Sequence, residues 1–430
     1  MNRRVVITGM GVVAPNGTGL EAYDRALRGG VSGLSHNETM AEAKFACTVA
    51  GVPEGTDEVA ESYFAEDELM AMNSSHRFGC IAAADAWTDA GYERPDPADD
   101  RVFWEAGAVI GTGIGGLDTV GARLVPMVDA GRVRRLGSTL VEQVMASGVS
   151  ARVSGQLALG NQVTANSSAC STGSEAIFEG MQRIRAGLAE RMLCGGTEGA
   201  SHYIWSGFDS MRVLCRTHND EPERSSRPMS ASAGGFIAGS GSAILHLESL
   251  DHAVARDARI YAEILGGAVN CGGHRHGGSM TAPNPVSVQR CIRQAVEDAG
   301  IDPMEIDLIN GHLTATGADP SEVRNWSEAL GRDPDSFPLI NSTKSMIGHG
   351  LGAAGALESV ACLLMLRGGY VHPSINCEDV HPEIEPFGAS IPHTLREMPG
   401  LGTIIKSGFG FGDVNACIVF RRWTDPTTSV

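Results

Sequence analysis

The chain has 430 residues, of which 42% are hydrophobic and 20% charged, and its formal net charge at neutral pH is −18. This length allows one large core or two fused domains, and the composition is typical of a globular protein. The negative charge argues against nucleic acid and against an anionic membrane surface as the main partner.

The ten cysteines are scattered and form no C-x-x-C pair, so the sequence predicts neither a zinc site nor any other metal site nor a disulfide framework. The start of the chain, MNRRVVITGMGVV, is typical of a strand and not of a signal peptide. We also expect no apolar run as long as a membrane-spanning helix. These patterns predict a cytoplasmic, reduced protein that does not bind a membrane.

Strand and helix patterns alternate along the first half, which is typical of an α/β architecture with buried sheets. The expected elements are, in order, a strand at 5–8 with a glycine turn at 9–11, helices at 20–27 and 77–89, a strand at 106–110 with a glycine-rich loop at 111–117, mixed helix and loop at 120–144, and strands at 192–193 and 243–247.

Cys170 lies where the pattern changes from strand to helix. Val163 and Thr164 predict a short buried strand, and small residues follow at 166–169. Apolar residues then recur at helical spacing, at Ala176, Ile177, Gly180, Met181 and Ile184. The free N–H groups at such a helix start would lower the pKa of the thiol and favour the thiolate. We therefore predict a nucleophile; the alternative is a small buried cysteine in a tight turn.

The same rhythm begins again near residue 251. The expected elements are a helix, a strand at 260–265, a helix at 288–299, a strand at 308–310, an apolar helix at 353–366, and strands at 403–406 and 416–420 hinged by Gly408, Gly410 and Gly412. Two halves of similar rhythm predict a duplicated α/β unit, with an N-terminal half at 1–250 and a C-terminal half at 251–430.

Three stretches of the second half carry reactive side chains at the ends of predicted strands. His312 is followed by hydroxyl residues and glycine, Lys344 precedes His349 by five residues, and glycine alternates with phenylalanine at 407–412. One such histidine alone would more often be a structural residue. A thiol, two histidines and a lysine, all at strand ends, together indicate a catalytic site.

These motifs resemble the β-ketoacyl-acyl-carrier-protein synthases of the elongating, Cys-His-His type, which have the thiolase-like fold. The resemblance runs from Arg3 to about Arg422 and is carried by 4–15, the Cys170 turn, Ser226-Arg227-Pro228, Met280-Thr281-Ala282-Pro283, the His312 loop, 344–358 and 409–415. It implies a duplicated, five-layered αβαβα fold with the active site where the halves meet. It also implies a homodimer, or a heterodimer with a ketosynthase-like chain-length-factor subunit.

The resemblance also implies roles for single residues. Cys170 would accept an acyl group from the phosphopantetheine thiol of an acyl carrier protein, which brings its own prosthetic group, so no cofactor is expected. His312 and His349 would stay neutral and donate N–H bonds to the malonyl thioester oxygen. Lys344 would orient this histidine site. The backbone N–H groups of Cys170 and Phe411 would hold the oxyanion.

The remaining implied positions surround that centre. Phe411 would also gate the acyl chain, and Glu358 and Thr281 would be structural residues beside the site. The expected acyl pocket consists of Ile114, Leu117 and Phe208, although ordinary core packing is the alternative. The expected docking patch for the acidic carrier protein consists of Arg132, Arg134, Arg135 and Arg212, against a solvated basic turn as the alternative.

Several residues depart from the pattern of the housekeeping fatty-acid enzymes. Leu313 to Gly317 replaces Gly-Thr-Ser-Thr-Pro, Asp413-Val414 stands where Gly-Thr is usual, and 66–75 lacks the usual basic patch. These departures favour a type II polyketide synthase, for a polyene-like chain, over primary fatty-acid synthesis. Two alternatives remain. A thiolase-type enzyme would need a second cysteine within 408–414, where there is none, and a non-catalytic chain-length factor would lack Cys170.

Overall fold

The computed structural model describes residues 3–424 of the chain. Strands and helices alternate along it as predicted, and eleven strands share one continuous hydrogen-bonded sheet. All ten cysteines lie in the described part and are unpaired, as expected from their spacing.

The two halves of the chain contribute the same strand arrangement to this sheet. The first half supplies β1 (Val5–Ala14), β5 (Ala106–Gly111), β6 (Val163–Thr164), β7 (Arg191–Glu198) and β9 (Gly241–Ser249), in the spatial order β6-β5-β7-β9-β1. The second half supplies β10 (Ala262–Cys271), β11 (Leu308–Asn310), β12 (Leu339–Asn341), β15 (Thr403–Gly410) and β16 (Val414–Arg422), in the order β12-β11-β15-β16-β10. In each half the first three strands of that order are parallel and the last two pairings are antiparallel. β1 pairs with β10 and joins the halves. The predicted duplication is therefore confirmed.

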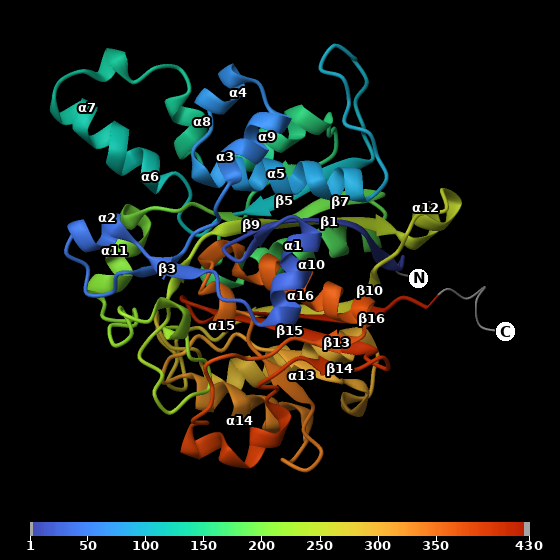
Figure 1. Ribbon diagram of the computed structural model, residues 1–430. Helices are drawn as coiled ribbons and strands as arrows, with labels where there is room; N and C mark the ends of the chain where they lie inside the picture. Colours follow the sequence, from blue (N-terminus) through green and yellow to red (C-terminus); the bar gives the residue numbers. More distant parts are fainter. Residues whose placement is uncertain (1–2, 425–430) are drawn as a thin grey trace.

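Helices separate and cover the two sets of strands in five layers (Figure 1). The outer helices α5 (Ser74–Asp89) and α9 (Gly148–Leu157) cover the first set. The central helices α10 (Thr172–Arg185) and α16 (Ala354–Gly368) contact each other and strands of both sets. The outer helices α13 (Pro285–Ala299) and α14 (Asp319–Leu330) lie beyond the second set. This is the five-layered αβαβα order implied by the resemblance.

The central helix α16 is buried along almost its whole length because strands lie on both sides of it. A helix apolar on every face is typical of such a position. The stretch Leu351–Gly368 is long and apolar enough to cross a membrane, and 89% of it is buried inside the protein. The expectation that no apolar run reaches that length was therefore wrong, because a core helix between two sheets has the same composition.

Strand β1 continues through the segment predicted as a glycine turn. A bulge lies between Ile7 and Gly9, and the strand then pairs with β9 as far as Val13. A Cβ atom on Gly9 would lie 2.2 Å from the carbonyl oxygen of Ala86 in α5, and one on Gly11 would lie 2.0 Å from that of Ala82. Glycine is needed here because a helix packs directly on the strand, not because the backbone turns.

The other elements lie mainly around the edges of these layers. The remaining helices are α1 (Leu20–Gly29), α2 (Glu38–Glu42), α3 (Thr56–Tyr63), α4 (Glu66–Met70), α11 (His202–Ser210), α12 (Leu250–Ala255) and α15 (Lys344–Ile347). The remaining strands are β2 (Gly17–Thr18), β3 (Leu34–His36), β4 (Val49–Gly51), β8 (Ala238–Gly239), β13 (Tyr370–Val371) and β14 (Arg396–Glu397). Between β5 and α9, an excursion that carries α6 (Leu117–Thr119), α7 (Val125–Asp129) and α8 (Leu140–Val144) stands out from the body (Figure 1).

Candidate active site

Cys170 lies in a 3₁₀ turn, Ala169–Ser171, that leads into α10, at the strand-to-helix junction predicted from the sequence. The Ser168 N–H donates to Oγ1 of Thr172 at 2.8 Å, and Oγ of Ser171 donates to the carbonyl of Gly408 at 2.9 Å. The second bond fastens the nucleophile turn of the first half to β15 of the second half. The site is therefore assembled across the two halves.

Gly408 and Gly410 belong to β15 and are not hinges, in contrast to the prediction. A Cβ atom on Gly410 would lie 3.0 Å from the backbone nitrogen of Cys170, and one on Gly408 would lie 3.3 Å from Cα of Ser171. The strand needs these glycines because the Cys170 turn rests on it. Only Gly412, with φ of 87°, lies in the turn between β15 and β16.

The thiol of Cys170 is not acidic, so the prediction of a lowered pKa was wrong. Burial raises the pKa of the Cys170 thiol to about 11, although the Phe411 backbone N–H and the charge of Lys344 act in the opposite direction. Removal of the sulfur from water thus outweighs the stabilisation from the helix start. The resting nucleophile is a neutral thiol, and its proton must leave when the sulfur attacks.

His349 is held in one tautomer by the backbone. Its own N–H donates to the carbonyl of Ile237 at 2.7 Å. Nδ1 of the ring lies 3.2 Å from the backbone N–H of Leu351 and accepts a hydrogen bond from it. A neutral ring that accepts at Nδ1 carries its proton at Nε2. Nε2 of His349 is therefore a hydrogen-bond donor.

His312 follows β11, and a buried carboxylate positions its backbone. Oε1 of Glu322 accepts the N–H of His312 at 2.6 Å, and Oε2 accepts the N–H of Leu313 at 2.8 Å. Asp319 accepts the N–H groups of Thr314 and Ala315 at 2.9 and 3.0 Å. Within residues 3–424 no hydrogen bond engages the His312 ring, so its tautomer is not fixed in the way that of His349 is.

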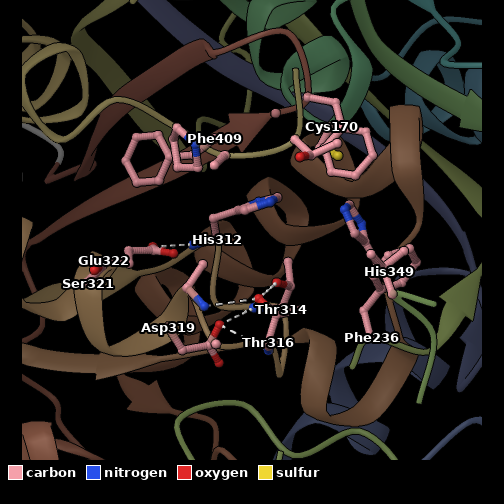
Figure 2. Close-up of a pocket in the computed structure, with 18 of the residues that line it drawn as sticks. Cys170, Phe236, His312, Thr314, Thr316, Asp319, Ser321, Glu322, His349 and Phe409 are labelled. Atoms are coloured by element: carbon pink, nitrogen blue, oxygen red, sulfur yellow. Dashed lines mark hydrogen bonds between the residues drawn. The ribbon is translucent and has the colours of Figure 1, made fainter. Parts of the chain in front are cut away.

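The three reactive side chains converge in one cavity. Sγ of Cys170 and a ring nitrogen of each of His312 and His349 all lie within 4.8 Å of one another, and Figure 2 shows both rings directed toward the sulfur. The two imidazole rings are 5.3 Å apart and nearly perpendicular. Burial, and after it the positive charge of Lys344, lowers the pKa of both histidines well below the ordinary value. Both rings are therefore neutral, as expected.

Lys344 is buried and forms an ion pair with Oε1 of Glu358, which lies on α16. Burial lowers the pKa of Lys344, and the charge of Glu358 opposes that shift. Lys406 on β15, which the sequence reasoning missed, lies 2.6 Å from the other oxygen, Oε2, of the same glutamate. A lysine inside the otherwise apolar run Thr403–Phe409 was the signal that could have identified it.

The cavity has a volume of about 500 Å³. Of the positions expected beside the site, Phe208, Thr281 and Phe411 line this cavity together with Cys170. Ile114 and Leu117 do not line it; they are half-buried and pack on the apolar cluster that also includes Phe208. Residues that the sequence reasoning did not assign to the pocket also line it, among them Val213, Phe236, Val288, Ser321 and Asn325.

Asp413, one of the departures from the family pattern, anchors the loop that passes the cavity. Its backbone has φ of 61°, and its side chain is fully buried. Its carboxylate accepts the backbone N–H of Asn284 at 2.8 Å and that of His274 at 3.1 Å. This loop contains Thr281, Ala282 and Pro283, which line the cavity. Asp413 therefore connects the turn that follows Phe411 to the opposite wall.

The predicted docking arginines lie on two surface elements. Arg132, Arg134 and Arg135 are exposed at the turn between α7 and α8, on the excursion that stands out from the body (Figure 1). Within the described chain no ion pair or side-chain hydrogen bond engages these three guanidinium groups. Arg212 is exposed at the end of α11, next to Val213 in the cavity wall.

Comparison with known proteins gives a consistent result. Residues 2–253 match the family model "Beta-ketoacyl synthase, N-terminal domain", and residues 261–378 match "Beta-ketoacyl synthase, C-terminal domain". The chain is 34% identical to the chloroplastic 3-oxoacyl-[acyl-carrier-protein] synthase I of Arabidopsis thaliana, over 98% of this chain and 87% of the relative.

Two solved structures extend the comparison. The ishigamide ketosynthase/chain length factor superposes with a TM-score of 0.88 at 29% identity, over 99% of this chain and 100% of that one. A chain from a type II polyketide acyl-carrier protein in complex with its ketosynthase bound to the hexaketide superposes with a TM-score of 0.85 at 29% identity, over 98% and 100%.

Proposed function

The chain belongs to the beta-ketoacyl synthase family, and on that premise we propose how its site works and which chains it extends. It is a condensing enzyme, an acyltransferase that forms a 3-oxoacyl thioester on an acyl carrier protein. The observation that carries the proposal is the convergence of Cys170, His312 and His349 within 4.8 Å in one cavity.

In the first step the enzyme takes the acyl group from its carrier. Sγ of Cys170 attacks the thioester carbonyl, and the bond to the phosphopantetheine sulfur breaks. Because the pKa of the thiol is about 11, its proton moves to a neutral imidazole as the sulfur attacks, and then to the departing thiol. His312 is the base, since Nε2 of His349 already carries a proton.

In the second step the malonyl group loses carbon dioxide. The bond between the carboxylate and the methylene carbon breaks, and its electron pair delocalises onto the thioester oxygen as an enolate. Nε2–H of His349 and a ring N–H of His312 donate to that oxygen. Fixed donors in a site without water stabilise a developing negative charge strongly. Neutral rings are needed, because the site holds the proton that it donates throughout this step.

In the third step the enolate carbon attacks the acyl group on Cys170. The carbonyl oxygen becomes an oxyanion, and the N–H groups of Cys170 and Phe411 hold it. The Phe411 N–H already hydrogen-bonds to the sulfur at rest, so this donor is in place before the reaction. Collapse breaks the carbon–sulfur bond, and the sulfur takes up one proton to regain the neutral thiol.

The chains that the enzyme extends are proposed to be type II polyketides. This is supported by the two polyketide ketosynthase structures above and by the departures at 313–317 and Asp413. A second candidate is fatty-acid elongation, because the Arabidopsis relative shares 34% of its residues with the chain. In both cases the acyl donor is a thioester of an acyl carrier protein.

The partners follow from the same proposal. Acyl carrier proteins are acidic, so a chain with net charge −18 needs a local basic patch to bind one. The unpaired Arg132, Arg134 and Arg135 supply such a patch. A heterodimer with a chain-length-factor subunit is proposed for a polyketide enzyme, and a homodimer for a fatty-acid enzyme. The cytoplasm is the proposed location.

Intact-mass analysis tests the proposal. The protein is incubated with acyl-carrier thioesters of graded length and unsaturation, and the mass added at Cys170 is measured before and after malonyl carrier protein is supplied. We expect unsaturated, polyketide-like chains to load and be extended faster than saturated chains of equal length. A preference for saturated chains would favour the fatty-acid role, and failure to load any chain would refute both.

A further inference from the structure

Two of the three lysines in this chain are buried against one carboxylate. The sequence contains only Lys44, Lys344 and Lys406. Lys44 is exposed, whereas the side chains of Lys344 and Lys406 are 2% and 0% exposed and that of Glu358 is 1% exposed. Burial of a charge without a partner is costly, so a second lysine on one glutamate calls for a reason.

The contacts divide the carboxylate between the two lysines. Nζ of Lys344 donates to Oε1 of Glu358, while Nζ of Lys406 lies 2.6 Å from Oε2 and also donates to the carbonyl of Ser407. Each oxygen therefore holds one ammonium group. One negative charge faces two positive charges, so this cluster keeps one positive charge in excess.

The excess charge acts on the catalytic centre. Lys344 and Lys406 both lower the pKa of His312, and both lower that of His349. The two lysines arise from different elements, α15 and β15, and β15 continues directly into Phe409, Gly410 and Phe411 of the site. Lys406 is thus linked to the histidines by charge and to the nucleophile turn by its strand.

We propose that Lys406 is a positioning residue of the condensation: it occupies the second oxygen of Glu358, so that the pair formed by Lys344 and Glu358 is not neutral and a positive charge remains behind the two histidines. That charge keeps both rings unprotonated and therefore able to donate to the enolate. Without Lys406, Lys344 and Glu358 would neutralise each other. This inference rests on the proposed function of the histidines as neutral donors.

Other ionisable groups also face this region. Glu322 supports the His312 backbone, and burial raises its pKa to about 7. Glu198 accepts the N–H groups of Gly113 and Gly352, and burial raises its pKa. Burial lowers the pKa of His372 to about 4, and the buried thiols of Cys362 and Cys417, with Cys170 in the cavity, complete the set. Glu322 is the one whose titration falls near neutral pH.

The test is the pH profile of carbon dioxide release from malonyl carrier protein, in wild type and four variants. Lys406→Met removes the excess charge, so the acid limb of the profile should move up by about one pH unit, the effect of a unit charge over roughly 12 Å at an effective dielectric constant of about 20. Lys406→Arg keeps the charge and should keep the wild-type limb. Glu358→Gln adds a charge and should move the limb down.

The double variant Lys406→Met/Glu358→Gln restores one positive charge and should return the limb toward wild type. Lys44→Met is the matched control and should change nothing, since Lys44 is exposed and far from the cavity lining. Repeating the Lys406→Met comparison in a Glu322→Gln background assigns the shift to the histidines if it persists there.

Three outcomes would overturn the inference. They are an unchanged acid limb in Lys406→Met, a loss of rate without a shift that Lys406→Arg does not rescue, and a shift that vanishes in the Glu322→Gln background. If Lys406→Met does not fold, the opposite shift expected for Glu358→Gln decides. A wild-type protein that releases no carbon dioxide would instead refute the proposed function itself.

Discussion

His349 offers the sharpest test of how the two histidines divide the reaction. Its Nδ1 accepts the Leu351 N–H at 3.2 Å, so the proton at Nε2 can be donated but the ring cannot take another proton from the thiol without giving up that bond. Replacement by alanine removes a fixed donor and leaves His312 in place as the base. We therefore expect His349→Ala to impair decarboxylation far more than acyl transfer to Cys170.

The expected magnitude follows from the geometry. Loss of one preorganised donor to a developing oxyanion costs about 2.7–4 kcal/mol, or about 10²–10³ in rate. Acyl transfer should fall by less than about tenfold, because its barrier depends on removing the proton from a thiol whose pKa is about 11. At pH 8 such a thiol would be ionised in about one molecule in a thousand, so a base is required, and His312 remains.

Two assays separate the steps. Carbon dioxide release from malonyl carrier protein reports decarboxylation, and intact mass reports the acyl group on Cys170. His349→Asn, which restores an N–H donor but no base, should recover part of the decarboxylation rate. Equal loss of both steps in a folded His349→Ala protein would refute the division, as would a loss of acyl transfer alone.

The other predictions concern the nucleophile, the acyl pocket and the docking patch. Cys170→Ala should abolish the acyl-enzyme mass and leave the circular dichroism spectrum unchanged; condensation by this variant would exclude Cys170 as the nucleophile. Phe208→Trp should shorten the longest chain loaded, because Phe208 lines the cavity, whereas Ile114→Trp should change it little, and the reverse order would restore the sequence-based assignment. Arg134→Glu with Arg135→Glu should raise KM for carrier-bound substrates and weaken its salt dependence, but leave a small thioester mimic unaffected; equal damage to both substrates would indicate a structural role.

The sequence predicted the elements that depend on local pattern. The Cys170 junction, the strand ends that carry His312 and His349, and the repeated α/β rhythm all have periodic or motif signals that need no knowledge of tertiary contacts. The duplicated order of strands confirms the rhythm. These features could be predicted because each is determined by residues close together in the chain.

What the sequence did not predict depends on contacts between distant residues. The pKa of Cys170 is raised because the second half of the chain buries the sulfur, which outweighs the local helix start. Gly9, Gly408 and Gly410 were interpreted as turn residues, yet each is a glycine because another segment packs against its strand. Lys406 was missed because its partner Glu358 lies on a different element.

The place of α16 in the chain has a consequence for biosynthesis. On the ribosome the first half emerges well before this helix, although α16 contacts β1, β7 and β9 of the first half as well as strands of the second. Until residues 354–368 are made, the inner face of the first sheet has only α10 to cover it, so the nascent chain exposes apolar surface of the kind that chaperones bind and that leads to aggregation. Messages truncated before α16 should therefore yield insoluble fragments, and expression of this enzyme should depend more on chaperone supply than that of an enzyme whose two domains each complete their own core.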